Sequence, residues 1–240
     1  MLKIDLHVHS LASGHAFNTI FELISYAGKK RIELLGITDH GPSMQGASHL
    51  GYFEMIEQIP EELDGVKIIA GCEANIISLE GKIDLPINIQ RKIALIIAGL
   101  HRRTPFPERT TTAENTRAIV KAIQRNEVDI LAHPYRPEFP VNIREVFRAA
   151  VDYGVLLELN LSLLNRYSTS NELLEQIYLM LELVEAKNEK ITISSDAHIA
   201  TQLGDDSILT RLRFKIPATL LLGNRRGYQE IKEFLNSRRK

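Results

Sequence analysis

The sequence has one cysteine, no tryptophan and no apolar run long enough to cross a membrane. Cys72 has no partner for an internal disulfide, and its place in the apolar stretch 68–74 indicates a buried structural thiol rather than a nucleophile. The longest apolar runs, such as 93–100, fall short of the ~20 residues of a membrane span. The N-terminus has no basic segment followed by an apolar one. We therefore expect a soluble, cytoplasmic protein without a membrane partner.

An excess of charge of one sign is also missing. The chain has 29 basic and 30 acidic residues and a net charge of −1, so no global field recruits nucleic acid or an anionic membrane. No Gly/Ser linker, charge block or low-complexity segment marks a domain boundary. With 240 residues and 44% hydrophobic content, the chain can bury a large core, and we expect one domain over residues 1–240. The oligomeric state stays open.

Short apolar runs alternate with segments of helical periodicity. The runs lie at 2–8, 34–38, 66–70, 93–100, 129–132, 155–159 and 191–194. The helical patterns lie at 17–30, with Asn18 as its cap, and at 52–63, 113–125, 143–153, 171–187 and 226–234. This alternation predicts an α/β protein with parallel strands and helical crossovers. Seven strand-and-helix units of about 30 residues each fill the chain, which favours a TIM-like barrel of seven strands.

Metal-binding residue types follow six of these seven runs. In chain order they are His7 and His9, His40, Glu73, His101, His133, and Asp196 with His198. Because parallel strands in a barrel end at one mouth, these side chains are expected to converge there. Any one histidine after a strand is usually an ordinary loop residue, but six such ends favour a polynuclear metal site. The remaining run ends in Glu158 and Asn160.

The first of these strand ends carries a His-x-His pair. Residues i and i+2 share one face of a strand, so His7 and His9 are expected to point the same way, while Ile4, Leu6 and Val8 point the other way. Alone, such a pair is more often a surface feature than a chelate. The ligand types at the other strand ends favour the chelating interpretation.

An ordered set of short motifs spans nearly the whole chain. They are Asp-Leu-His-Val-His at 5–9, Gly-Ile-Thr-Asp-His at 36–40, Gly-Cys-Glu at 71–73, Gly-Leu-His at 99–101, Ala-His-Pro at 132–134 and Ser-Ser-Asp-Ala-His at 194–198. In this the chain resembles the PHP (polymerase and histidinol phosphatase) superfamily. It is most similar to the compact, stand-alone bacterial phosphatases, whose distorted seven-stranded barrel holds three metal ions. We expect no attached polymerase domain.

The resemblance implies how the ligands divide among three ions. One ion would be held by His7, His9, Glu73 and Asp196, and a second by Glu73, His101 and His133, with Glu73 as the bridge. The third would be held by His15, His40 and His198. His15 lies in a Ser-Gly-His loop, and from the residues alone a solvated side chain is as good an interpretation.

Imidazole and carboxylate donors without thiolate suit zinc, manganese or iron, and zinc is the metal we expect. Asp39 is either a residue that orients His40 or an acceptor in the turn before Gly41, and it is left out of the ligand set. His49 lies in the loop 41–51, off the pattern of strand ends, and is expected at the surface or on the substrate side.

A polynuclear site lowers the pKa of bound water to about 7 and neutralises phosphoryl oxygens. We therefore expect a metal-dependent phosphoesterase that attacks a small phosphorylated substrate with metal-bound hydroxide. Arg102 or Arg103, after His101, and Arg136, after His133, are candidate phosphate ligands, although each is also an ordinary loop charge. Together with these arginines, the expected catalytic residues include Glu73 and Asp196; the general acid is either Asp196 or a water.

Three other functions compete with this one. An amidohydrolase also fits a barrel with clustered histidines, but no lysine follows the fourth strand to bridge metals, where Ala-Gly-Leu-His stands instead at 98–101. A non-catalytic metal-binding barrel is the second alternative, and the full ligand set argues against decay. A nuclease is disfavoured because no aromatic and basic stripe accompanies the near-neutral charge. The substrate itself is not predicted, because its specificity depends on the loops 41–51, 104–112 and 134–142.

Overall fold

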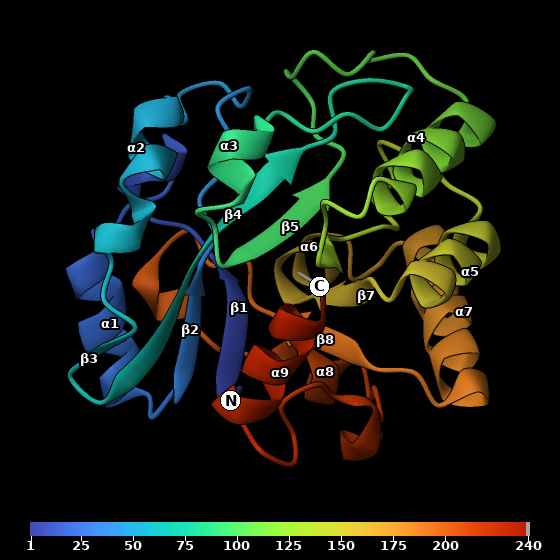
Figure 1. The fold of residues 1–240 in the computed structure, drawn as a ribbon. Coiled ribbons are helices and arrows are strands. Elements are labelled where there is room, and N and C mark those ends of the chain that lie inside the picture. Colours follow the sequence, from blue (N-terminus) through green and yellow to red (C-terminus); the bar gives the residue numbers. More distant parts are fainter. Residues whose placement is uncertain (239–240) are drawn as a thin grey trace.

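Seven parallel strands follow one another around a barrel in the computed structural model, which describes residues 1–238 (Figure 1). They pair in chain order, as β1 (Ile4–Val8), β2 (Leu34–Ile37), β4 (Val66–Asn75), β5 (Leu95–Gly99), β6 (Ile130–Leu131), β7 (Leu156–Asn160) and β8 (Ile191–Ser194). The barrel is nearly closed, because Val8 forms a parallel bridge with Ala197, just after β8. The expected (β/α)7 barrel is thereby confirmed.

Helices cover the outside of the barrel (Figure 1). The longer ones are α1 (Ile20–Lys29), α4 (Thr112–Gln124), α5 (Ile143–Tyr153), α7 (Asn171–Lys187) and α9 (Tyr228–Arg238). Short helices are α2 (Leu50–Glu54), α3 (Ile87–Gln90), α6 (Leu161–Arg166) and α8 (Ser207–Arg211), with single 3-10 turns at η1 (Leu11–Ser13), η2 (Ile56–Gln58), η3 (Ala200–Gln202) and η4 (Ala218–Leu220). Within residues 1–238, none of the helices has the length and apolar character of a membrane span.

The single helix expected at 52–63 is wrong. The segment contains the end of α2, the turn η2 and the short strand β3 (Glu62–Leu63), which pairs antiparallel with β4. Pro60 disfavours helix at the residue before it, and Asp64-Gly65 follows with both residues at positive φ. An Asp-Gly pair in that conformation is a strong hairpin signal, so local turn chemistry overrides the helical periodicity.

The cap of α1 is Thr19 rather than Asn18. The Thr19 hydroxyl accepts from the Glu22 backbone N–H at 3.2 Å, and the Glu22 carboxylate accepts from the Thr19 N–H at 2.7 Å. This reciprocal pair satisfies two amide groups at the start of the helix. The Asn18 side chain instead accepts from the Ala200 N–H at 2.8 Å, which ties the start of α1 to the segment after β8.

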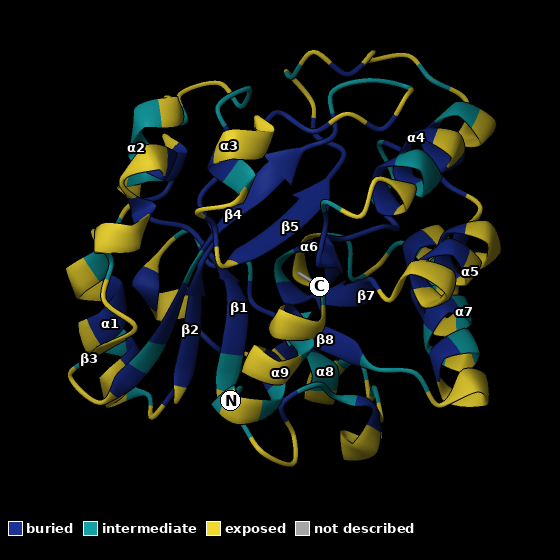
Figure 2. Cartoon of the chain, viewed as in Figure 1, coloured by how far each residue is buried: buried dark blue, intermediate teal, exposed yellow. Residues whose placement is uncertain are grey.

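The core forms two layers, one inside the barrel and one between the barrel and its helices. Figure 2 shows strands that are buried along most of their length and helices with exposed outer faces. Aliphatic side chains from the strands fill the half of the barrel near the N-terminal ends of the strands, and Ile231 and Leu235 of α9 pack onto them. The C-terminal helix therefore closes the N-terminal end of the barrel and leaves the opposite mouth for a site.

Strand β1 is irregular, and its side chains contribute to both layers of the core. Leu6 belongs to the cluster inside the barrel, whereas Val8 packs outside against α1. The expectation that Leu6 and Val8 share a face is wrong, because the register with β2 shifts between Asp5 and Val8. A bulge of this kind places two successive residues on one side of a strand, here Leu6 and His7. The imidazole of His7 thus follows Leu6 into the barrel.

Candidate metal centre

The predicted ligand residues meet at the C-terminal mouth of the barrel. They come from the end of β1, from β4, and from the segments that follow β1, β2, β5, β6 and β8. His7, His9 and Glu73 are each at most 1% exposed, and His101 and His133 are also buried. Burying so many imidazole and carboxylate groups together without a compensating ion is unfavourable, so the cluster itself points to bound cations.

His7, His9 and Asp196 place ligand atoms within 4.8 Å of one another, and one oxygen of Glu73 lies next to both imidazoles. The His7 Nε2 atom lies 3.3 Å from Glu73 Oε2 and 3.6 Å from Asp196 Oδ1. The His9 Nε2 atom lies 3.6 Å and 3.1 Å from the same two oxygens. Tetrahedral zinc with bonds of 2.0–2.1 Å separates its ligand atoms by about 3.3–3.4 Å. The four distances between imidazole nitrogens and carboxylate oxygens, 3.1–3.6 Å, are close to this separation and are compatible with a shared ion.

These four atoms are not satisfied by hydrogen bonds from the described residues, although Glu73 Oε2 lies 2.6 Å from His40 Nδ1 and Asp196 Oδ1 lies 3.5 Å from His198 Nδ1. His7 Nε2, His9 Nε2, Glu73 Oε2 and Asp196 Oδ1 are buried, and none makes a hydrogen bond with a residue in the described part of the chain. Buried polar atoms are normally satisfied, and an unsatisfied one costs roughly 1–3 kcal/mol. Four such atoms this close together are best explained by a metal that accepts their lone pairs.

A second group forms on the other oxygen of the same carboxylate. Glu73 Oε1 lies 3.0 Å from His101 Nε2 and 2.9 Å from His133 Nε2, and the two nitrogens are 3.4 Å apart. Glu73 therefore faces the first group with Oε2 and the second with Oε1, as a carboxylate between two ions does. A ligand atom of His40 also lies within 4.8 Å of those of Glu73 and His101.

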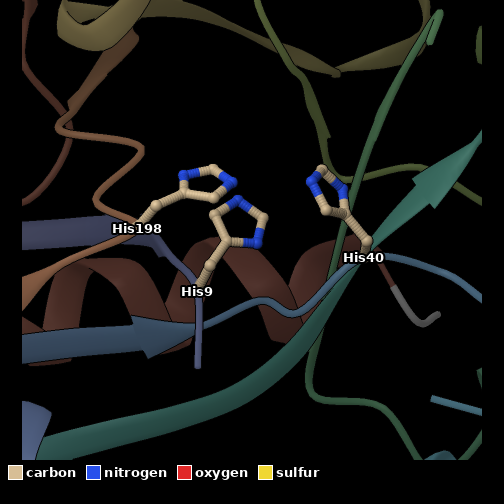
Figure 3. A group of neighbouring side chains, drawn as sticks. All are labelled: His9, His40 and His198. Atoms are coloured by element: carbon tan, nitrogen blue, oxygen red, sulfur yellow. The ribbon is translucent and has the colours of Figure 1, made fainter. Parts of the chain in front are cut away.

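A third set of imidazoles lies next to the first group. His9, His40 and His198 place ligand atoms within 4.8 Å of one another, and Figure 3 shows their three side chains gathered at the barrel mouth. The ring of His15 stacks on His40 and on His198, with centroids 4.9 and 4.8 Å apart. The structure thus brings His15 to its expected neighbours, with His9 as an additional one.

The electrostatics of the centre attract positive charge. Burial alone would lower the pKa of His7, but the carboxylates of Glu158, Glu73 and Asp196 outweigh it and raise this pKa well above its ordinary value. Burial likewise opposes ionisation of Glu73, yet neighbouring imidazoles hold its pKa well below the usual range. Three carboxylates that stabilise a cationic imidazole also stabilise a metal cation at the same point.

Glu158 and Asn160, at the end of β7, hold the ligands in place. Glu158 Oε1 lies 2.7 Å from His7 Nδ1, and its Oε2 accepts from the His133 N–H at 3.0 Å. The amide of Asn160 donates to Glu158 and, at 3.2 Å, to Asp196 Oδ2. From the sequence, both residues were recognised only as the end of a strand, without a role. With Glu158 as acceptor, His7 carries its proton on Nδ1 and presents a free Nε2 lone pair.

Two of the predicted ligand residues have left-handed backbones. His133 has φ +33° and Asp196 has φ +54°, a region that non-glycine residues rarely occupy. Such conformations cost of order 1–3 kcal/mol and persist where surrounding contacts enforce them. The contacts here come from Glu158, which binds the His133 amide, and from Asn160, which binds the Asp196 carboxylate.

Asp39 acts on His9 through a serine rather than on the His40 side chain. The Ser13 hydroxyl donates to Asp39 Oδ1 at 2.6 Å and lies 2.9 Å from His9 Nδ1. Because the serine proton is given to the carboxylate, the His9 Nδ1–H must be the donor to Ser13, which leaves Nε2 free. Asp39 also accepts from Ser10 and from the Tyr52 hydroxyl at 2.7 Å. Its role as a positioning residue depends on loops that the sequence could not place.

Gly99, at the end of β5 and two residues before His101, leaves space for the imidazole of His133. A Cβ atom on Gly99 would lie 2.6 Å from Cε1 of His133. No side chain fits there unless the imidazole moves. The Gly-Leu-His motif at 99–101 thus combines a ligand with the clearance that the neighbouring ligand needs.

Arginines line the open side of the centre. A cavity of about 170 Å³ extends from the histidines to Arg102, Arg136 and Arg166, and Arg103 is not among its lining residues. These three arginines follow β5, β6 and β7, so they lie along one side of the mouth. Arg166, at the end of α6, was missed by the sequence analysis because it belongs to no motif. The larger cavities at the opposite end of the barrel and under α9 contain none of the predicted ligands.

Comparison with known proteins gives the same architecture. A profile of the PHP domain matches residues 5–234. The chain belongs to the PHP domain family. The PHP chain is 38% identical to a probable phosphatase of Caldanaerobacter subterraneus subsp. tengcongensis, over 100% of its own length and 93% of the relative. It is 36% identical to a probable phosphatase of Thermoanaerobacter sp., over 100% and 96%.

A solved structure shares the fold of this PHP domain. It is the histidinol phosphate phosphatase of Lactococcus lactis subsp. lactis, in complex with zinc, L-histidinol and phosphate. The TM-score is 0.59 at 19% identity, and the match covers 90% of this chain and 96% of that one. Because the identity is low, this similarity supports the barrel fold and carries no residue assignments.

Proposed function

We propose that this PHP protein is a divalent-metal-dependent phosphatase that hydrolyses a small phosphorylated substrate at a trinuclear centre. The observation that carries the proposal is the four-atom group of His7, His9, Glu73 and Asp196, with a spacing compatible with a shared ion and buried polar atoms left unsatisfied by the described residues. The names of the relatives, which are probable phosphatases at 36–38% identity, support the choice of phosphoesters.

The residues suit three ions. His7, His9, Glu73 and Asp196 would hold one, and Glu73, His101 and His133 a second. His15, His40 and His198 would hold the third. We expect zinc, with manganese or iron as alternatives, because imidazole and carboxylate donors accept all three. Bound divalent ions would acidify a water and neutralise phosphoryl oxygens.

The protein's own groups orient the reactants. Glu158 and the Asp39–Ser13 pair keep His7 and His9 in the tautomer that presents Nε2 to the centre. Arg102 and Arg136 would bind phosphate oxygens through their planar donor groups. The proton for the leaving alcohol would come from a water or from Asp196, which lines the same cavity. Burial opposes ionisation of Asp196, but His7 and the neighbouring imidazoles hold its pKa well below the ordinary value, so Asp196 would first have to take that proton from the attacking water.

Metal analysis combined with substrate panels tests this function. Elemental analysis of the reconstituted protein is expected to give about three ions per chain, and chelation is expected to abolish hydrolysis of p-nitrophenyl phosphate. Fewer than one ion per chain after reconstitution would overturn the metal centre. Hydrolysis of amides but not phosphoesters would favour the amidohydrolase alternative, and a fully metallated protein inactive on both panels would favour a binding role.

A further inference from the structure

A second cavity adjoins the proposed metal centre. It has a volume of about 330 Å³ and shares Ser162 and Arg166 with the cavity that contains the histidines. Its other walls are mainly hydroxyl, amide and carboxylate groups from Asn165, Ser195, Gln202 and Asp205, with Leu161 as the apolar member. No aromatic ring lines it among the residues that the structure describes. Such a lining suits a polar, hydroxylated carbon skeleton rather than a stacked base.

The wall between the two cavities carries more positive charge than one phosphate requires. Three divalent ions and the four carboxylates of the centre, which are Glu73, Asp196, Glu158 and Asp39, would leave a charge of +2, and a bound hydroxide would reduce it to +1. One phosphate dianion would more than balance that charge. This count rests on the proposed function, because it uses its three divalent ions.

The arginines add charge beyond this balance. Arg102, Arg136 and Arg166 line the centre's cavity, and the acidic side chain that faces them is Glu138. Glu138 lies 3.6 Å from Arg136 and accepts the Tyr167 hydroxyl proton at 2.9 Å, so its single charge is already engaged. Neither Arg102 nor Arg166 forms an ion pair with a carboxylate within residues 1–238. Arg102 and Arg166 therefore face the mouth without an ion pair, although Asp205 also lines the cavity that adjoins Arg166.

We propose that the substrate is a sugar or polyol bisphosphate, whose second phosphate is bound by Arg166, the arginine that lines both cavities. The reacting phosphate occupies the metal centre and the hydroxylated skeleton extends into the adjoining cavity. Asp205 lies in that cavity and is ionised, because hydrogen bonds from Ser207 hold its pKa below the ordinary value. Its charge disfavours an anion beside it in that cavity and so favours the second phosphate at Arg166.

Compounds that share one carbon skeleton but carry one or two phosphates test this proposal. We would compare glucose 1,6-bisphosphate with glucose 1-phosphate and glucose 6-phosphate, using phosphate release for kcat/KM and calorimetry of the metal-loaded protein for Kd. A charge-assisted pair contributes about 1.5–3 kcal/mol, which is about a 10–100-fold effect. The wild type is expected to favour the bisphosphate by at least tenfold in kcat/KM and in Kd.

The variant R166Q is expected to abolish most of that preference by weakening the bisphosphate selectively. R144Q, on the exposed outer face of α5, is the matched control and is expected to retain it. Equal losses on both monophosphates and the bisphosphate would overturn the proposal, because Arg166 would then bind only the reacting phosphate. A wild type without preference, or one that prefers adenosine 3′,5′-bisphosphate, would also overturn it.

The calorimetric arm separates this proposal from the phosphatase function. If no phosphoester is hydrolysed but the bisphosphate still binds more tightly in an Arg166-dependent way, the proposed phosphatase function is refuted and the proposed site for the second phosphate is supported. If p-nitrophenyl phosphate is hydrolysed but the bisphosphate is neither bound nor hydrolysed better than the monophosphates, the phosphatase function is supported and the proposed site for the second phosphate is refuted.

Discussion

Replacing Glu158 with alanine is expected to weaken metal binding although Glu158 is not among the proposed ligands. The substitution removes the acceptor for His7 Nδ1, at 2.7 Å, and the acceptor for the His133 amide, at 3.0 Å. Both donors are buried, and each unsatisfied donor costs roughly 1–3 kcal/mol, so the free energy of unfolding is expected to fall by about 2–6 kcal/mol. Removing a residue that orients metal ligands typically lowers metal affinity by about 10–100-fold.

Two measurements separate orientation from simple structural support. Zinc affinity would be determined by competition with a chromophoric chelator, and stability by urea unfolding. Asp84→Asn is the matched control, because Asp84 is also a buried carboxylate at this end of the barrel that accepts two backbone N–H groups, from Ser43 and Asn75. It contacts no histidine, so it is expected to lower stability without changing zinc affinity.

The conservative variant refines the test. Glu158→Gln keeps one carbonyl oxygen for His7 but places an NH2 group near the His133 N–H, so an intermediate loss of affinity is expected. If Glu158→Ala destabilises the fold while zinc affinity stays within twofold of the wild type, Glu158 is a structural residue and the reasoning is refuted.

Four further outcomes are expected. Glu73→Ala is expected to lose two ions together by elemental analysis, because the two oxygens of Glu73 face different ligand groups; loss of one ion would exclude bridging. Gly99→Ala is expected to displace the His133 imidazole and lower the metal content, whereas an unchanged content would show that the ring adapts. Chelation is expected to lower the free energy of unfolding by about 4 kcal/mol relative to protein with free metal at 1,000 times Kd, and an unchanged urea midpoint would contradict it. Cys72 is fully buried and its thiol pKa is raised well above the ordinary value by burial, so it is expected to react with Ellman's reagent only after unfolding.

Much of the barrel follows from local pattern. The helices at 143–153 and 171–187 have the predicted bounds, and all seven strands lie within two residues of at least one predicted end. Their apolar periodicity is strong, and long periodic segments leave few alternatives. The prediction of one helix at 52–63 was wrong because Pro60 interrupts the segment and an Asp-Gly turn follows it. The predicted cap at Asn18 was wrong because the capping box that starts one residue later is stronger.

The convergence of the predicted ligands could also be predicted from the sequence. Each strand-and-helix unit returns the chain to the same end of the barrel, so residues that follow successive strands become neighbours whatever the intervening sequence. The positions of His7, Glu73 and His133 could therefore be predicted from spacing and residue type, although they are up to 126 residues apart.

Only the tertiary structure decided how these residues work together. Which oxygen of Glu73 faces which histidines, the bulge that turns His7 inward, and the contact between His7 and Glu158, 151 residues away, all depend on register and barrel closure. The place of Arg166 at the mouth depends on a short helix without a sequence signal. Local periodicity carries no information on such contacts, because they form between segments that only the closed barrel brings together.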